Sequence, residues 1–431
     1  MKKINLNHIQ IKNFIIFINI FLMLNLPFLL ISFISGYERP IFNIDIIILA
    51  SIIFKFRRAY FLAIFYFIAE VITYILNIYD FMTISDLLYL AQFFKDLPFF
   101  YQIQILLLGA AFSFLCYFSK KINKPFKTIF SILLILYLGL FITLKRELYF
   151  SPFFYLYENF DYHRLIIRDN IKNSIEENPY HSLYDTIKKS NGDKVLVILN
   201  ESWGVTNDRD MQAKILSPLT SKIKNYKLGE EFFIGGTGIA EFRELCSFRP
   251  ANVDVQKITD FKEHTSNCIP NLFQKKGYHT ISLHGAKLDL YDRKYWYPLV
   301  GFQKSLHKEN LPEMQKCGLF DGYCDHDTIK KVLIPLLKNN EKSFIHYVTL
   351  DTHTPYNKKI GDNHLNCNLS EESCRNLNLQ YEFFTEISNL TNQVENIDIF
   401  IIGDHQPPIS NKSESKRVFK KDTISWIYFS I

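Results

Sequence analysis

The strongest constraint on how this chain can fold is the uneven distribution of its apolar residues. A helix needs about 20 apolar residues to cross the hydrocarbon core of a bilayer. Five apolar runs of helical length or somewhat shorter occur, and all end before residue 146: Phe14–Ile34, Ile41–Phe54, Tyr60–Leu76, Ile103–Phe118 and Ile129–Leu144. They predict an α-helical transmembrane bundle of about five helices, although the second run is short and contains Asp45.

Basic residues mark every other connection between these runs. Ten of them lie before the first run, after the second and after the fourth: Lys2, Lys3, Lys12, Lys55, Arg57, Arg58, Lys120, Lys121, Lys124 and Lys127. The alternate connections carry only Arg39 and Lys95. Because basic residues stay on the cytoplasmic side, five crossings place the long C-terminal part outside the cytoplasm. The net charge of +6 lies largely in these clusters, so we expect an integral membrane protein and no nucleic-acid partner.

Cysteine usage indicates the same compartment independently. Six of the seven cysteines lie in the C-terminal part, and two close pairs have identical spacing. An even number of cysteines is typical of disulfides in an oxidising compartment, whereas a zinc site is disfavoured because no CxxC occurs. We expect sequential pairing, although the sequence alone leaves other connectivities open: Cys246–Cys268, Cys317–Cys324 and Cys367–Cys374.

From about Lys194 the pattern changes to alternating strands and helices. The predicted strands are Val195–Leu199, Phe232–Ile234, His279–Leu283, Phe344–Leu350 and Ile397–Ile402. Helical stretches lie between them, including Ile329–Lys338 and Glu371–Ser388. This alternation predicts an α/β domain with a mostly parallel central sheet.

These patterns divide the chain into three parts. Residues 1–146 form the predicted transmembrane domain. Residues 147–193 are charged and aromatic with weak helical periodicity, and predict a connector that runs along the membrane. Residues 194–431 form the predicted extracytoplasmic domain. Heavy use of Ile, Asn, Lys and Phe suggests an AT-rich bacterial genome. Together with the apolar runs, the basic clusters and the cysteines, this predicts a multi-pass protein of the bacterial inner membrane whose C-terminal domain is periplasmic or extracellular.

Polar residues follow the predicted strands, and ligands bind beyond the carboxyl ends of strands in such sheets. Glu201, Asp404 and His405 supply two carboxylates and one imidazole, which are ligands for a divalent ion such as Mn²⁺, Mg²⁺ or Zn²⁺. Thr237 lies in a Gly-Gly-Thr-Gly turn. A hydroxyl bound to a divalent ion loses its proton more easily and becomes a usable nucleophile.

Three further residues are candidates for binding phosphate oxygens or protonating a leaving oxygen: His284, Arg293 and His353. Each candidate taken singly also has an ordinary explanation, such as a solvated loop carboxylate, a tight turn or a hydrogen-bonded histidine. The hypothesis of one site depends on all of them lying at strand ends of a single domain.

Five motifs occur in an order that resembles the alkaline phosphatase superfamily. The chain looks most like its sulfatase-like membrane transferases, which include lipoteichoic acid synthase and the phosphoethanolamine transferases. The resemblance covers about residues 195–410. The motifs are Val195–Gly204 (VLVILNESWG), Thr237–Phe242 (TGIAEF), Leu283–Arg293 (LHGAKLDLYDR), Thr352–Tyr356 (THTPY) and Gly403–His405 (GDH).

The resemblance implies specific roles for these residues. Glu201, Asp404 and His405 would hold the metal together with Thr237, the nucleophile. His284 and Arg293 would lie in the head-group segment, and His353 in the active-site histidine segment. Two departures concern the head-group pocket: Ala286 stands where lipoteichoic acid synthases have Asp, and Tyr291 stands where they have Trp.

The implied function is a metal-dependent transferase of phospholipid head groups, phosphoethanolamine or phosphoglycerol, acting through a phosphothreonine intermediate. A membrane phospholipid would be the donor, and an envelope glycan or lipid the acceptor. A phosphodiesterase or sulfatase-type hydrolase of the same fold is the first alternative. A non-catalytic, lipid-binding regulator of the envelope is the second. The motifs leave the head group, the acceptor and the metal open.

Overall fold

The computed structural model describes residues 43–55, 62–79, 175–177, 183–250, 265–317, 321–356 and 364–431, with isolated residues between 21 and 156. The chain divides into two compact units. The first comprises Met1–Tyr79, Phe99–Leu165 and Ser410–Lys412. The second comprises Asp80–Pro98, Ile166–Ile409 and Ser413–Ile431.

The first unit contains helices α2 (Ile44–Lys55) and α3 (Leu62–Ile78), which correspond to the second and third apolar runs. Asn43 and Glu70 are buried there, and the Asn43 Nδ2 donates to the Tyr66 hydroxyl at 2.9 Å and to Glu70 Oε1 at 3.3 Å. No helix in the described parts of the chain has both the length and the apolar character needed to span a bilayer. The first, fourth and fifth apolar runs lie almost wholly outside the described residues.

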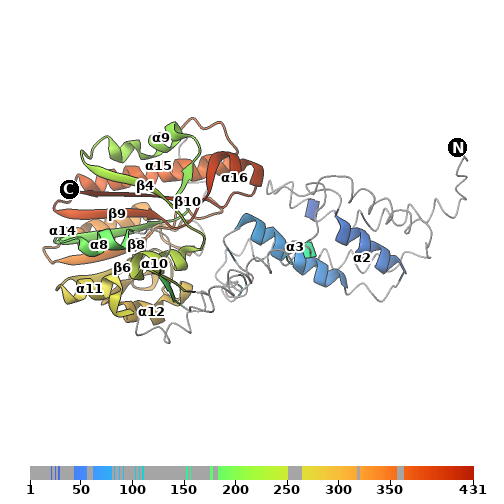
Figure 1. Cartoon of the computed structure of the whole chain (residues 1–431), viewed down its shortest axis with the longest axis horizontal. Coiled ribbons are helices and arrows are strands. Elements are labelled where there is room, and N and C mark those ends of the chain that lie inside the picture. The colour runs from blue at the N-terminus through green and yellow to red at the C-terminus, as the bar shows by residue number, and fades with distance from the viewer. Residues whose placement is uncertain are drawn as a thin grey trace, which may run out of the picture. The chain divides into compact units, whose positions relative to one another are not determined.

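An eight-stranded sheet forms the framework of the second unit (Figure 1). Seven strands follow the order β3-β10-β9-β2-β8-β6-β7, and β4 pairs with β10. Strands β9, β2, β8, β6 and β7 are parallel to one another, whereas β10 is antiparallel to β9, β3 and β4. The bounds are β2 Lys194–Asn200, β3 Gly204–Thr206, β4 Tyr226–Phe232, β6 His279–His284, β7 Lys304–Leu306, β8 Ser343–Val348, β9 Ile397–Gly403 and β10 Phe419–Ser430.

The helices that surround this sheet lie mainly between its strands in the chain. They are α8 Tyr184–Lys189, α9 Arg209–Thr220, α10 Thr237–Cys246, α11 Ile269–Lys275, α12 Arg293–Val300, α13 Asp325–Thr328, the π-turn η9 Ile329–Leu333, α14 Ile334–Lys338, α15 Glu371–Thr391 and α16 Lys412–Val418. Single 3₁₀ turns are η5 Thr265–Asn267, η6 Leu290–Asp292 and η7 Lys308–Asn310. A separate antiparallel pair joins β1 (Ile175–Glu177) to β5 (Phe248–Pro250).

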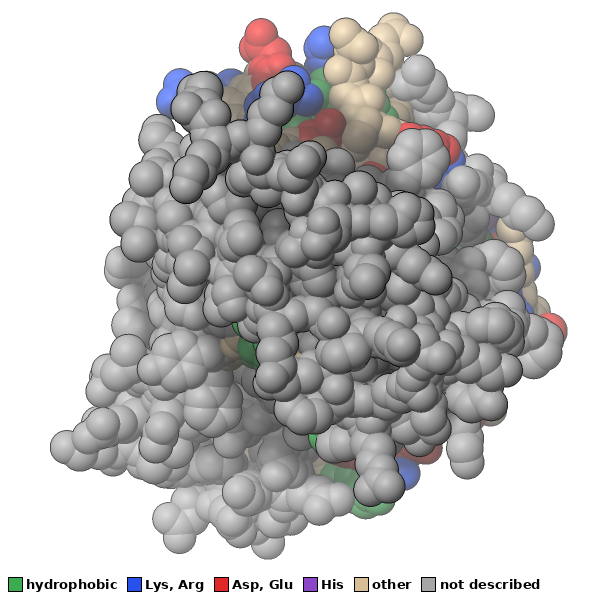
Figure 2. Space-filling view, turned by 90° about the vertical axis from the view of Figure 1, so that its right-hand side faces the viewer, with side chains coloured by type: hydrophobic (Ala, Val, Ile, Leu, Met, Phe, Trp, Pro, Cys, Tyr) green, Lys and Arg blue, Asp and Glu red, His purple; other side chains and the backbone are tan. Residues whose placement is uncertain are grey.

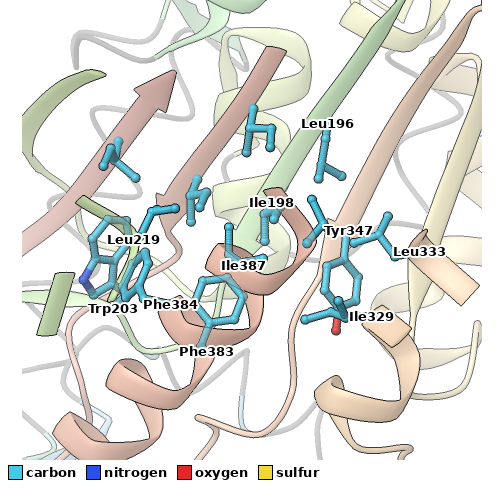
Figure 3. Close-up of a cluster of buried hydrophobic side chains, with 14 of the residues drawn as sticks. Leu196, Ile198, Trp203, Leu219, Ile329, Leu333, Tyr347, Phe383, Phe384 and Ile387 are labelled. Atoms are coloured by element: carbon cyan, nitrogen blue, oxygen red, sulfur yellow. The ribbon is translucent and has the colours of Figure 1, made fainter. Parts of the chain in front are cut away.

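Helices cover both faces of the sheet, which explains the unbroken apolar run of β2. Leu196 and Ile198 point to the face that α9, α14 and α15 cover, and Figure 3 shows them in one cluster with side chains of α15, among them Phe384 and Ile387. Val195, Val197 and Leu199 point to the opposite face and join the cluster made with α8, α10, α11 and α12. Successive strand residues face opposite ways, so a strand buried on both faces has no polar alternation.

The structure corrects two of the expectations for the sheet. The central strands are parallel as predicted, but the sheet as a whole is mixed because β10 reverses direction. The predicted strand Phe232–Ile234 is wrong, since β4 ends at Phe232 and runs antiparallel to β10 at the edge of the sheet. Its exposed residues include Glu230, which pairs with Lys420. In Figure 2, acidic and basic side chains likewise lie next to one another where described residues are visible.

Three disulfides tie neighbouring segments of the second unit, and they are the three expected pairs. Cys246–Cys268 joins the last residue of α10 to the residue that caps α11. Cys317–Cys324 closes a short loop before α13. Cys367–Cys374 holds the first turn of α15.

Candidate active site

Parallel strands deliver most of the candidate residues to one edge of the sheet. Glu201 directly follows β2, Asp404 and His405 directly follow β9, and His284 is the last residue of β6. His353 lies in the loop after β8. Because the carboxyl ends of parallel strands meet at one edge, residues more than 200 positions apart become neighbours.

Thr237 reaches this edge by a different route from the predicted one. It is the first residue of α10, whose preceding residue, Gly236, has extended backbone angles. Every residue of α10 is buried, so the helix is fixed along its whole length. The positive end of the helix dipole therefore lies at the threonine hydroxyl, where negative charge is favoured.

Four residues converge on one point, as the sequence predicts. Single ligand atoms of Glu201, Asp404 and His405 all lie within 4.8 Å of one another. The Thr237 hydroxyl donates to Asp404 Oδ2 at 2.8 Å and lies 3.4 Å from Glu201 Oε2. His405 Nε2 lies 3.4 Å from Glu201 Oε1 and from Asp404 Oδ2. All four residues are at most 5% exposed.

This cluster fits a divalent cation. Burial and the neighbouring Asp404 carboxylate raise the pKa of Glu201, because two carboxylates held together away from water repel each other. A bound cation would remove that penalty. Two carboxylates, one imidazole and one hydroxyl form a hard to borderline donor set that suits Mn²⁺, Mg²⁺ or Zn²⁺. A second group of ligand-type residues, Cys317, Cys324 and Asp351, is less suitable since its cysteines form a disulfide.

Ser202 links the two carboxylates and was not identified from the sequence. Its backbone N–H donates to Asp404 Oδ1 at 2.7 Å, and its hydroxyl donates to Glu201 Oε1 at 2.9 Å. Ser202 adopts a left-handed conformation with φ of 54°, which turns the chain sharply at the end of β2. A short polar residue directly after the first ligand is the only sequence signal for this role.

His353 lies close to the cluster as an uncharged imidazole. Burial lowers its pKa to about 4, with a further lowering by His405 that Asp404 opposes. Its Nδ1 contacts the carbonyl of Thr354. The ring is therefore neutral at pH 7.

His284 and Arg293 belong to a second buried cluster, which packs against α10 through Glu241. His284 Nδ1 lies 2.9 Å from the Val348 carbonyl, and burial lowers its pKa well below the usual range. Arg293 is fully buried and pairs with Glu241 of α10, Nη2 to Oε2 at 2.9 Å. Within the described part of the chain, the hydrogen bonds of Arg293 go to Glu241 and to the Leu290 carbonyl, and none goes to the four-residue cluster.

The structure therefore does not support the predicted contact between Arg293 and phosphate oxygens. The guanidinium is committed to an ion pair in the interior because Glu241, one helical turn after Thr237, also needs a partner away from water. Arg243, on the same helix, pairs with the neighbouring Glu244.

Tyr291 connects the two clusters. Its ring lies against Gly238, where an added Cβ would come within 3.2 Å of it, and the Arg293 guanidinium lies 5.1 Å from the ring centre. Its pKa is raised first by burial and then by Glu201, and Thr237 is among the groups that influence it. The residue that departs from the lipoteichoic acid synthase pattern thus packs beside the candidate nucleophile.

A sequence model of the Sulfatase family matches residues 193–423, which is more than half of the chain. A protein of Rhizobium meliloti (strain 1021), named "Putative cyclic beta-1,2-glucan modification protein", is 29% identical over 169 residues. That match covers 38% of this chain but only 26% of the relative, so the chain spans about a quarter of that protein's length.

Three solved structures are similar to part of the chain. The lipoteichoic acid synthase LtaP of Listeria monocytogenes has a TM-score of 0.47 and 17% identity, covering 61% of this chain and 71% of that one. The phosphoglycerol transferase GacH of Streptococcus pyogenes has a TM-score of 0.41 and 18% identity, covering 62% of this chain and 75% of that one. The lipooligosaccharide phosphoethanolamine transferase EptA of Neisseria meningitidis has a TM-score of 0.38 and 13% identity, covering 77% of this chain and 63% of that one.

Proposed function

This chain belongs to the Sulfatase family, and from that premise we propose that it is a metal-dependent transferase of phospholipid head groups. The observation that carries the proposal is the Thr237 hydroxyl, held 2.8 Å from Asp404 at the start of α10 and beside Glu201 and His405. A nucleophile, a set of metal ligands and the positive end of a helix coincide at one buried point. This combination suits attack on a phosphodiester.

The first step transfers the head group to the enzyme. The Thr237 oxygen attacks the phosphorus of phosphatidylethanolamine or phosphatidylglycerol, and an Oγ–P bond forms while the bond from phosphorus to the diacylglycerol oxygen breaks. The proton lost by Thr237 balances the proton that diacylglycerol gains. His353, whose ring is neutral, is the candidate to accept the proton of Thr237 and pass it to the leaving oxygen, whereas His284 lies in the second cluster with Arg293. A cation held by Glu201, Thr237, Asp404 and His405 would act as a Lewis acid toward the hydroxyl and a phosphoryl oxygen.

The second step regenerates the threonine. A hydroxyl of an envelope glycan or lipid attacks the phosphothreonine ester, the Oγ–P bond breaks, and the proton of the acceptor returns to Thr237. Positive charge for the phosphoryl oxygens comes from the start of α10 in this scheme, since Arg293 is engaged by Glu241.

Intact-mass analysis tests the first step. The purified, Mn²⁺-loaded chain, incubated with either phospholipid, should gain the mass of one phosphoethanolamine or phosphoglycerol group. Thr237→Ala should gain none, while Thr237→Ser should retain some labelling because it keeps the hydroxyl. The absence of an adduct on the unsubstituted chain, or an equal adduct on Thr237→Ala, would contradict the mechanism.

Product analysis separates the transferase from a hydrolase of the same family. In a transferase, an added glycan acceptor should increase turnover and carry the head group. Steady release of free phosphoethanolamine or glycerol phosphate, unaffected by acceptor, would favour the hydrolase. A non-catalytic regulator is disfavoured because all four candidate metal and nucleophile positions are filled and converge.

A lipid donor is consistent with an envelope location. We propose that the chain is an integral protein of the bacterial inner membrane and that the three disulfide-bonded segments face the periplasm or the exterior. The basic clusters and apolar runs before residue 146 support this placement. Carbonate-washed membranes should retain the chain, and protease added to spheroplasts should digest residues 194–431. Release by carbonate, or protection from protease, would contradict the placement.

A further inference from the structure

Helix α15 presents two buried amides, one turn apart, to the backbone that carries Glu201. The Gln380 Nε2 donates to the carbonyl of Glu201 at 2.9 Å and to that of Ser202 at 3.1 Å. The Asn376 Nδ2 donates to the Ser202 carbonyl at 3.3 Å. Both amides are 1% exposed. Carbonyl groups turned into the interior need such donors, because leaving a buried polar group unpaired is destabilising.

The backbone held by these amides is the turn that joins both candidate metal carboxylates. Ser202 donates from its backbone to Asp404 and from its hydroxyl to Glu201. Its left-handed conformation is unfavourable for a residue with a Cβ and persists only where the surroundings enforce it. A change in the orientation of this turn would therefore displace Glu201 and Asp404 together.

Gln380 also holds the strand end just before the turn. Its Oε1 accepts from the Asn200 Nδ2 at 2.7 Å, and the Asn200 Oδ1 in turn accepts from the Thr349 hydroxyl at 3.2 Å. Thr349 further accepts from the Glu201 backbone N–H at 2.9 Å. One amide thus contacts three consecutive residues, from the last residue of β2 through the left-handed turn.

Helix α15 is a rigid support for these contacts. Its first turn is capped by Ser370, whose hydroxyl accepts from the Ser373 N–H, and is held by the disulfide Cys367–Cys374. Phe384, one turn after Gln380, packs edge-on against Trp203, the residue that follows Ser202, with ring centres 4.9 Å apart. Figure 3 shows Trp203 and Phe384 side by side.

We propose that Gln380, assisted by Asn376, is a positioning residue of the metal site, setting the distance between the Glu201 and Asp404 carboxylates without touching the cation. The inference rests on the proposed metal-dependent function. Residues that orient metal ligands in this way contribute roughly 10–100-fold to metal affinity. No feature of the sequence near residue 380 indicates such a role.

Metal titration of the full chain tests the proposal. Gln380→Met removes the amide N–H donors to Glu201 and Ser202 and the acceptor for Asn200 while nearly preserving volume. It should weaken binding of Mn²⁺ and of Zn²⁺ by about 10–100-fold in calorimetry. The matched control is Asn378→Leu, on the same helix. Asn378 is also buried, but its amide donates to the Cys374 carbonyl and accepts from the Leu365 N–H. It should lower thermal stability and leave metal affinity within about twofold.

Asn376→Leu keeps the proposal testable if Gln380→Met does not fold. It removes one long hydrogen bond to Ser202 and should weaken metal binding by a smaller factor, about three- to tenfold. Unchanged affinity in the folded variants would overturn the inference, as would an equal loss in Asn378→Leu. Failure of the unsubstituted chain to bind either metal would overturn the proposed function as well.

Discussion

At the scale of single residues, the buried ion pair behind the nucleophile is the most consequential arrangement in this domain. Glu241 and Arg293 have no exposed side-chain surface, and the Glu241 carboxylate also contacts the Tyr297 hydroxyl and lies 3.3 Å from His346 Nε2. A charge in the interior is tolerated only when it is fully partnered. The pair joins α10, which carries Thr237, to the first residue of α12.

Removing one partner should be far more damaging than removing both. Glu241→Gln leaves the Arg293 charge buried, which costs about 3–5 kcal/mol. The midpoint of thermal unfolding should fall by roughly 10 °C for a domain of this size. Replacing both residues with apolar ones, Glu241→Leu with Arg293→Met, should recover much of the loss. Glu230→Gln, which breaks the exposed pair with Lys420, should change the midpoint little. Equal effects of Glu241→Gln and Glu230→Gln would refute this account.

The same pair predicts a pH dependence of stability. Burial by itself would raise the pKa of Glu241, but Arg293 and hydrogen bonds from His346 and Tyr297 lower it from 4.5 to about 2. A folded-state pKa below the unfolded one stabilises the protein above about pH 4.5, and this contribution is lost as the pH falls toward 2. Between pH 5 and pH 3, the unfolding midpoint of the unsubstituted chain should therefore fall relative to that of the apolar double variant. A constant difference over that range would show that Glu241 does not titrate in this way.

At the scale of elements, α10 is held at both ends. Thr237 at its start lies in the metal-ligand cluster, and Cys246 at its end is bonded to Cys268 at the start of α11. The ring closed by this disulfide spans a sequence separation of 22 residues. The position of the nucleophile therefore depends on a helix whose far end is covalently anchored.

Loss of that anchor should destabilise the domain. Closing a ring of this length stabilises a protein by about 3 kcal/mol, mainly by restricting the unfolded chain. Cys246→Ala with Cys268→Ala should lower the unfolding midpoint by roughly 5–10 °C. Cys367→Ala with Cys374→Ala, which opens a separation of 7 residues, is the matched control and should have a smaller effect. A reversed order would show that ring size does not govern the contribution of these disulfides.

At the scale of the whole molecule, the candidate metal site should connect ligand binding to stability. Glu201 and Asp404 repel each other without a cation, and their segments follow two central strands of the sheet, β2 and β9. A cation that binds only the folded chain stabilises it by about 2.7 kcal/mol at 100 times its dissociation constant. Metal binding should therefore be visible as cooperative stabilisation of the sheet domain.

Removal of metal should lower the unfolding midpoint accordingly. Chelation by EDTA should reduce it by roughly 5–10 °C, and added Mn²⁺ or Zn²⁺ should restore it. Asp404→Asn should abolish this response and should not be less stable than the metal-free unsubstituted chain, because it removes one of two repelling carboxylates. Scanning calorimetry of both chains measures the effect. An unfolding midpoint that changes with neither EDTA nor added metal would argue against a cation at this site.

Much of the central domain follows from local sequence patterns. The strands β2 and β9 were predictable because each contains a short apolar run that is followed by polar residues, and β6 and β8 were predicted although polar side chains interrupt them. The family resemblance identified Glu201, Thr237, Asp404 and His405, and the structure brings these four together. The Sulfatase match confirms the resemblance at the level of the family. The disulfide pairs could be predicted because each joins cysteines that are close in sequence.

Features that depend on distant contacts were decided only by the tertiary structure. Pairing of β4 with β10 joins segments about 200 residues apart, and no local pattern specifies which edge a strand will meet. The commitment of Arg293 to Glu241 and the support of Glu201 by Gln380 have the same origin. Sequence patterns indicate which side chains can act as metal ligands or nucleophiles and which strands are buried. The partner of a buried charge or amide is settled only when packing removes water and leaves it a single neighbour to bind.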